Sequence, residues 1–116
     1  METRVRPSDN AAAMEDLPNL LDRIQALVDG RDDAAPERLL ERMEHTLTDG
    51  YARALALEAE YLRIAREIGP ATAGALAERL SAIEYDRERL RALLTPLRLQ
   101  TQALASSLAP ARRVHS

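Results

Sequence analysis

Two stretches of the sequence carry apolar residues in alternating steps of three and four, the spacing that aligns side chains along one face of an α-helix. The first series is Leu40, Met43, Leu47, Gly50, Ala54, Leu57, Tyr61, Ile64 and Ile68. The second series is Leu76, Leu80, Ile83, Arg87, Leu90, Leu94, Leu97, Thr101, Leu104 and Leu108. The steps of one series are the mirror image of the steps of the other. The two faces can therefore close on each other as a long antiparallel helical hairpin that resembles a coiled coil.

The two series also agree in side-chain size. In this register Gly50 faces Leu94 and Ala54 faces Leu90, so small residues stand where large ones need space. Asp49 and Gly50 form a dipeptide that is typical of turns, but the apolar steps continue through them without a change of phase. We therefore predict a continuous helix over 36–68.

Proline and glycine mark the ends of the expected helices. Gly69-Pro70 ends the first arm of the hairpin, and a second arm over 72–108 follows, with Thr72 as a candidate cap. Pro96 lies inside this second arm and should bend it, because its ring collides with the carbonyl of residue 92. We expect Pro110 to end the arm and to leave a flexible tail over 109–116.

A third, shorter amphipathic segment precedes the hairpin. Apolar residues at helical spacing predict a helix over about 16–29, with Asp16 as its cap, Pro18 in its first turn and Gly30 as its stop. Residues 1–15 show no periodicity, and we expect a disordered arm there. The prediction is an all-α protein with one helical domain over 16–108, which agrees with a composition of 21 Ala, 19 Leu and 16 Arg.

Little in the sequence points to catalysis. The chain has no Cys and no Lys, which removes thiolate and lysine chemistry. The Glu-x-x-His pairs of bundle metal sites do not occur, and His45 lies four residues from Glu41 and from Asp49 on an outward face. We expect no catalytic residue, no cofactor and no metal site, so the protein is not interpreted as an enzyme. A helical-bundle enzyme or ligand binder is kept as a second alternative.

The hairpin seam does not use all of the apolar surface. Six large residues lie off the seam and form the predicted interaction surface: Tyr51, Leu55, Leu62, Tyr85, Leu93 and Leu99. A short first helix can cover only part of such a surface. We therefore expect a non-enzymatic interaction, scaffold or oligomerisation protein that forms a homo-oligomer, with a dimer favoured, and that could also bind another protein.

Charge is distributed unevenly along the chain. Residues 1–86 hold 10 Arg against 18 acids, a balance of −8, whereas residues 87–116 hold 6 Arg against one acid, a balance of +5. The Arg-rich part, with Arg89, Arg91, Arg98, Arg112 and Arg113, supports an alternative function as a small regulator that contacts nucleic acid. The net charge of −3 and the presence of only three Tyr as aromatic residues argue against that alternative.

Arg87 is the one charged residue of the seam. It falls opposite Leu57, and a polar seam residue can fix the register or the oligomeric state of paired helices. The simpler interpretation lays its stem along the seam and its guanidinium near Glu58, Glu60 or Glu84.

No run of about 18 apolar residues and no signal-peptide pattern is present in the sequence. We therefore expect no membrane contact and a cytoplasmic protein.

Overall fold

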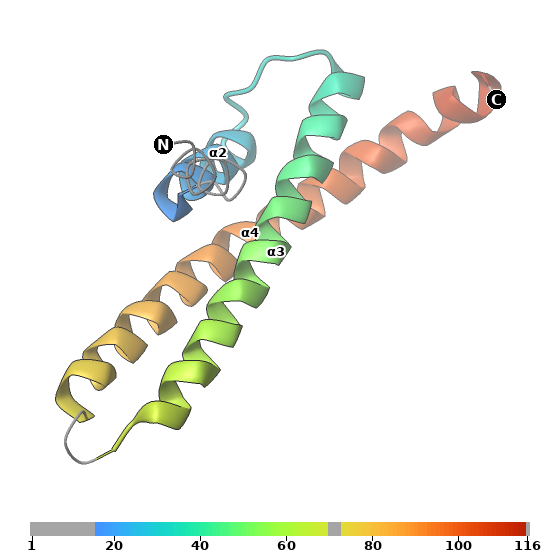
Figure 1. The fold of residues 1–116 in the computed structure, drawn as a ribbon. Coiled ribbons are helices and arrows are strands. Elements are labelled where there is room, and N and C mark those ends of the chain that lie inside the picture. The colour runs from blue at the N-terminus through green and yellow to red at the C-terminus, as the bar shows by residue number, and fades with distance from the viewer. Residues whose placement is uncertain (1–15, 70–72, 116) are drawn as a thin grey trace, which may run out of the picture.

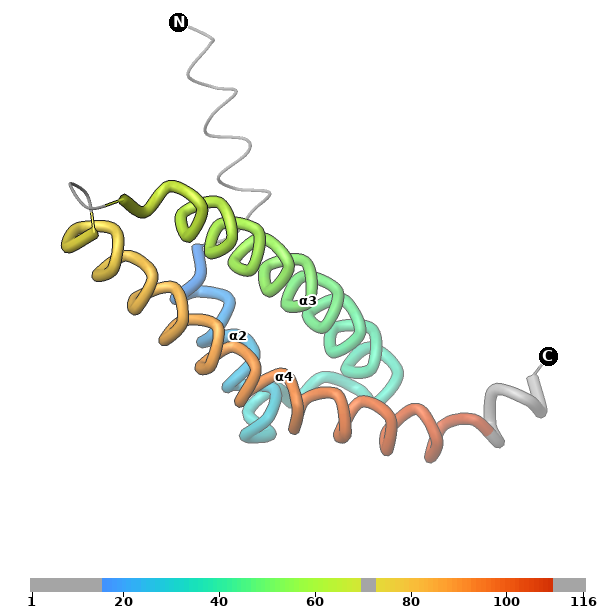
Figure 2. Tube along the Cα trace, turned by 90° about the horizontal axis from the view of Figure 1, so that it is seen from below, coloured from blue at the N-terminus to red at the C-terminus, as the bar shows by residue number. Residues whose placement is uncertain are grey.

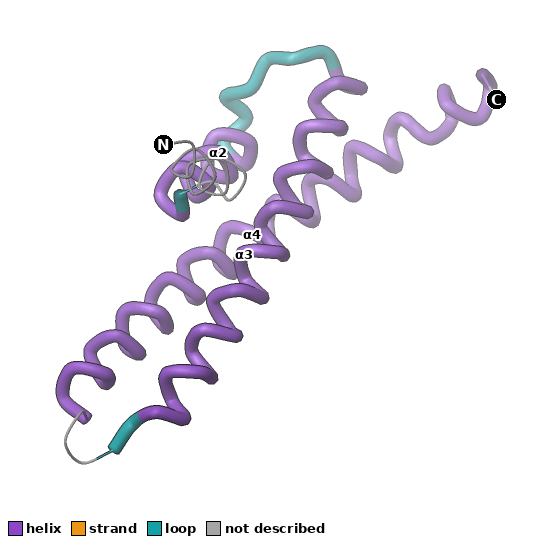
Figure 3. The backbone as a smooth tube through the Cα atoms, in the orientation of Figure 1, coloured by secondary structure: helices purple, strands orange, loops and turns teal. Residues whose placement is uncertain are grey.

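The computed structural model describes residues 16–69 and 73–115, and within them the chain forms three α-helices and no strand (Figures 1 and 3). Helix α2 spans Leu17–Val28, α3 spans Pro36–Glu67 and α4 spans Ala73–His115. The predicted all-α fold, a long helical hairpin with a short helix before it, is confirmed. The arm predicted over 1–15 and the candidate cap Thr72 lie outside the described residues.

Helix α2 begins and ends where its sequence predicts. Gly30 adopts a left-handed φ of 73°, and the Arg31 N–H donates to the carbonyl of Ala26 at 2.9 Å, the pattern of a Schellman cap. Asp16 occupies the N-cap position as predicted, but its side chain makes no capping hydrogen bond. A cap binds the amide of the second or third helical residue, and the second residue here is Pro18, which has no N–H.

Helix α3 is continuous through Gly50, as the unbroken apolar phase predicts. Pro36 occupies its first turn, where an amide is not needed, and Glu37 adds a negative charge near the positive end of the helix. The helix ends at Glu67, and Ile68 is already extended, with a ψ of 128°.

Helices α3 and α4 lie side by side and close a common apolar seam (Figure 1). A Cβ atom built on Gly50 would stand 2.5 Å from the Cδ2 atom of Leu94, so these two residues face each other as the predicted register requires. The seam is buried along much of its length, through Met43, Leu57, Ile64, Ile83, Leu90, Leu94 and Leu97. Apolar burial along these matched faces is the main force that holds the hairpin together.

Helix α2 packs across both arms of the hairpin (Figures 1 and 2). Its apolar stripe is fully engaged, since Leu17, Leu20, Leu21, Ile24 and Leu27 are all buried. Polar contacts support this packing at two points. Gln100 donates to the carbonyl of Val28 at 3.2 Å, and Arg23 donates to Asp49 at 2.8 Å.

Helix α4 departs from the prediction at its end. We expected it to stop at Leu108, but it runs to His115 and includes Pro110. Proline has a φ close to the helical value and removes only one hydrogen bond, so it does not end a helix by itself. The helix also changes direction in its orange stretch, between the 80 and 100 marks of the colour bar in Figure 2, in agreement with the bend expected at Pro96.

Candidate interaction surface

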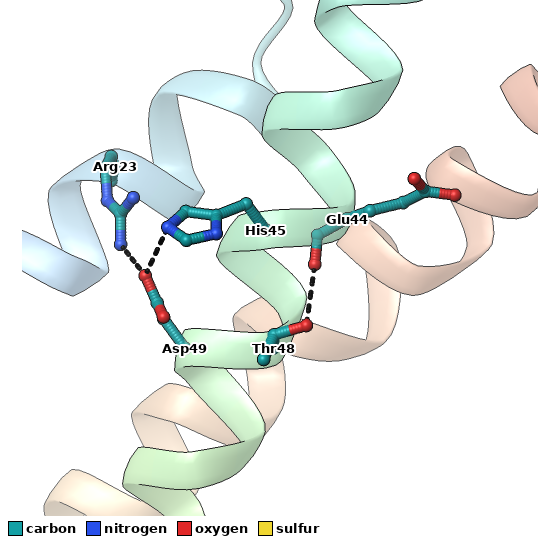
Figure 4. Close-up of polar contacts among 5 residues, drawn as sticks. All are labelled: Arg23, Glu44, His45, Thr48 and Asp49. Atoms are coloured by element: carbon teal, nitrogen blue, oxygen red, sulfur yellow. Dashed lines mark hydrogen bonds and ion pairs between the residues drawn. The ribbon is translucent and has the colours of Figure 1, made fainter.

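One side of the hairpin is occupied by α2. On that side Asp49 of α3 accepts from Arg23 of α2 and lies 3.5 Å from the Nε2 atom of His45 (Figure 4). Thr46, one residue after His45, is buried at 2 % exposure. Glu44 points away from α2 in the same view. The side of α3 that carries Thr46 and Asp49 is therefore the side covered by α2.

The opposite side of α3 carries the exposed apolar residues. Leu55 follows Thr46 by nine residues, about 2.5 helical turns, so the two side chains point in opposite directions. Leu55 is 70 % exposed, Leu62 is 48 % exposed and Tyr51 is 44 % exposed. These three residues of the predicted surface lie within one narrow stripe of α3, and their exposure shows that α2 leaves it uncovered.

A groove of about 330 Å³ runs between α3 and α4 beside this stripe. Its lining residues are Tyr51, Ala54, Glu58, Arg87, Arg91, Leu94, Thr95 and Arg98. Ala54 and Leu94 provide apolar surface at the seam, whereas three guanidinium groups come from α4. We call this groove together with Tyr51, Leu55 and Leu62 the interaction face.

Arg87 is half-buried, and its guanidinium lies over the ring of Tyr61 with 5.4 Å between its Cζ atom and the ring centroid. This cation–π contact takes the place of the ion pair that the sequence suggested. Of the expected acids, Glu84 accepts a hydrogen bond from the Tyr61 hydroxyl at 3.1 Å and Glu60 pairs with Arg79 at 2.9 Å. The bond to Glu84 raises the pKa of Tyr61, because ionisation would break it and bring two negative charges together.

The other two arginines of the groove are exposed. Arg91 pairs with Glu88 on its own helix at 3.3 Å, whereas Arg98 has no acidic partner within the described part of the chain. Glu58 is the only acid among the groove residues. The groove is therefore net positive on a chain whose total charge is −3.

The three remaining residues of the predicted surface lie elsewhere. Tyr85 and Leu99 are 64 % and 56 % exposed, and they follow the seam residues Ile83 and Leu97 by two positions, which turns them to the back of α4. Arg89, which the sequence grouped with Arg91 and Arg98, lies over the Tyr85 ring at 5.7 Å and so belongs to this back surface.

Leu93 corrects the prediction. It is half-buried and packs against the core cluster that includes the apolar residues of α2. The reason is its position on α4, four residues before Leu97 and seven before Gln100, which bonds to α2. Leu93 therefore belongs to the side of α4 that α2 covers.

A second groove, of about 480 Å³, lies between α2 and α3. Its two arginines are paired within the chain, Arg23 with Asp49 and Arg42 with Asp32. Arg42 donates to Asp32 at 2.7 Å, and this bond, with a second one from the Ala34 amide, lowers the pKa of Asp32. The Asp32–Arg42 bond joins the loop after α2 to α3, and the groove offers few free polar groups to a ligand.

No group of acidic or histidine side chains within residues 16–69 and 73–115 is arranged to hold a metal ion. None of the helices over those residues combines the length and the apolar character needed to cross a membrane.

Comparison with family models, with curated proteins and with solved structures gave no match to this chain. The interaction face therefore has to be interpreted from its own chemistry. Sequence reasoning identified its apolar residues and its arginines but did not bring them together as one groove. The signal was present, because Tyr51 and Leu94 stand almost opposite each other in the predicted register.

Proposed function

We propose that this protein is a non-enzymatic helical module that self-associates through its interaction face. The observation that carries the proposal is the exposure of Leu55, Leu62 and Tyr51 on one stripe, on the side of the hairpin that α2 does not cover. Apolar surface gathered in this way is stabilised when a second surface removes it from water.

The chemistry of the face favours a second copy of the chain as its occupant. Glu58 of α3 and Arg91 and Arg98 of α4 border the same groove, so the face carries both signs of charge together with apolar surface. A face of this kind can be complementary to itself, as the two-fold interface of a homodimer requires.

Exposed apolar residues lie both on the α3 stripe and on the back of α4, and the α3 stripe is the better anchor for a second chain. Leu55 and Leu62 are seven residues apart on one stripe, which also carries the groove residue Tyr51. Tyr85 and Leu99 are fourteen residues apart on the back of α4, and Arg89 already covers the Tyr85 ring. This difference provides a matched control for the experiment.

The test is the mass of the chain in solution, measured by light scattering over a concentration series. Wild type should have twice the mass of one chain at high micromolar concentration, and the double variant Leu55→Glu, Leu62→Glu should have the mass of one chain. Leu99→Glu introduces the same charge at an equally accessible leucine and should leave the mass of the dimer unchanged. A wild-type chain that remains monomeric would contradict the proposal.

The arginines of the groove also make nucleic acid a second candidate partner. Glu58 lies among them and Glu44 borders the same side of α3, and both acids repel phosphate. A salt-sensitive electrophoretic shift with duplex DNA or RNA, lost in Arg91→Glu, Arg98→Glu, would support that candidate in place of self-association.

A further inference from the structure

We infer that two copies pair with their hairpins parallel, so that α3 of each copy lies over the arginine groove of the other. This inference rests on the proposed self-association and specifies its geometry. It assigns Glu44 and Glu58 of one copy as the partners of Arg98 and Arg87 in the other, with Tyr51 seated between them.

The register of the hairpin sets the height of each residue along its axis. Gly50 lies level with Leu94. Glu58 follows Gly50 by eight residues and is therefore level with residue 86, about 1.5 Å from the height of Arg87. Glu44 precedes Gly50 by six residues and is level with residue 100, about 3 Å from the height of Arg98. Each acid thus shares its height with an arginine.

The acids and the apolar anchors of α3 share one stripe. Glu44, Tyr51 and Glu58 succeed one another at intervals of seven residues, which returns a helix to nearly the same direction. The stripe therefore reads acid, aromatic, acid from one end to the other. Figure 4 shows Glu44 on the side of α3 away from α2, where this stripe lies.

A two-fold axis parallel to the hairpin preserves these heights. It places α3 of the second copy over α4 of the first, antiparallel to it, and moves no residue along the axis. Glu44 of the second copy then meets Arg98, its Tyr51 meets the surface of Leu94 and Thr95, and its Glu58 meets Arg87. Symmetry repeats the same contacts in the other direction, so four acid–arginine pairs form at once.

The other two-fold arrangement is electrostatically poor. An axis perpendicular to the hairpin, in the plane of the interface, places α3 over α3 and α4 over α4. The arginines of α4 would then face the same arginines of the second copy across the interface. Like charges that face each other across an interface repel, and Arg98 would still have no acid opposite it.

Cysteine cross-linking separates the two arrangements, and the natural absence of cysteine gives a clean background. We would prepare Tyr51→Cys and Thr95→Cys as separate full-length chains, mix them, and oxidise the mixture. The two positions lie at nearly the same height on different helices, so the parallel arrangement should give a mixed disulfide dimer. Neither variant oxidised alone should cross-link appreciably. In the parallel arrangement, the two copies of the same position lie over different helices, on opposite sides of the two-fold axis, and are too far apart to form a disulfide.

Each outcome of this experiment decides a different statement. A mixed disulfide dimer supports the parallel arrangement. Cross-linking within one variant, without the mixed product, overturns the arrangement but leaves self-association intact. Absence of every cross-link together with a monomeric wild-type mass overturns both the arrangement and the proposed function. Circular dichroism of each variant establishes that the helices are retained.

Charge reversal provides an independent readout. Arg98→Glu and Glu44→Arg each reverse the charge of one member of the assigned Glu44–Arg98 pair, and Glu58, the partner assigned to Arg87, is left unchanged. Arg87 is left unchanged because it packs on the Tyr61 ring. Each variant alone should dimerise at least about tenfold more weakly than wild type, whereas an equimolar mixture should recover a dimer that contains one chain of each kind. A mixture as weak as its two components would contradict the assigned pair.

Discussion

Leu94 occupies the space that a side chain at Gly50 would need, since a Cβ atom there would stand 2.5 Å from its Cδ2 atom and 3.4 Å from its Cγ atom. Leu94 is itself buried, at 5 % exposure. The close approach of α3 to α4 at this point explains why a glycine is retained in the middle of a long helix, where it costs about 1 kcal/mol relative to alanine.

Gly50→Ala should destabilise the chain in spite of the better helix propensity of alanine. Overpacking a buried contact costs about 1–3 kcal/mol, which outweighs the propensity gain of about 1 kcal/mol. We expect a net loss of up to about 2 kcal/mol in the free energy of unfolding, measured by urea denaturation.

Two further variants test the cause of that loss. Gly74→Ala, at a helical glycine with no atom within 4 Å of the added Cβ, should be neutral or stabilising. Leu94→Ala should cost about 1 kcal/mol less in the Gly50→Ala background than in wild type, because it removes the collision. Strictly additive effects of Gly50→Ala and Leu94→Ala would show that the two side chains do not compete for this space.

Pro96→Ala should stabilise the chain. It restores the amide that can bond to the carbonyl of Ala92, although part of the gain is offset because proline also restricts the unfolded chain. We expect an increase of about 1–2 kcal/mol in the free energy of unfolding and slow exchange of the new amide proton in NMR. A decrease in the free energy of unfolding would mean that the bend is needed to pack α2 against α4.

The Asp32–Arg42 bond should make stability depend on pH in the acid range. The folded-state pKa of Asp32 is lowered, first by the hydrogen bond from Arg42 and then by the Ala34 amide. Its contribution is therefore complete above the unfolded pKa and is lost as pH falls through the lower folded pKa. Asp32→Asn should lower the Tm at pH 7, and its difference from wild type should be smaller at an acid pH below the folded pKa of Asp32. An equal difference in Tm between wild type and Asp32→Asn at both pH values would mean that the effect comes from the shape of the side chain and not from its charge.

The hairpin could be predicted because its information is local and periodic. The unbroken spacing of apolar residues predicted a continuous helix through Gly50, and the match of side-chain sizes predicted Leu94 opposite it. The structure has both features. Which side of the hairpin receives α2 could not be predicted in this way. That choice depends on polar pairs such as Arg23 with Asp49 and Gln100 with Val28, which join residues far apart in the sequence and leave no periodic trace.

The errors in the predicted surface have the same origin. In the sequence Leu93 cannot be distinguished from Leu55 and Leu62, because all three are leucines that lie off the predicted seam. Only the position of α2 distinguishes them. The position of Arg87 over Tyr61 could have been inferred from the register, because Arg87 follows the expected partner of Tyr61, Ile83, by one helical turn. The end of α4 could not, since Pro110 permits helix on either side of it.

The placement of α2 also sets the valency of the hairpin. A bare pair of helices has two broad sides, and a unit that can be joined on both sides can add further units without limit. Because α2 closes one of these two broad sides with five buried apolar residues, only the other broad side carries the interaction face. Under the proposed self-association, assembly through that side would end when two copies have met, so the short helix would keep the product finite and prevent growth into a filament.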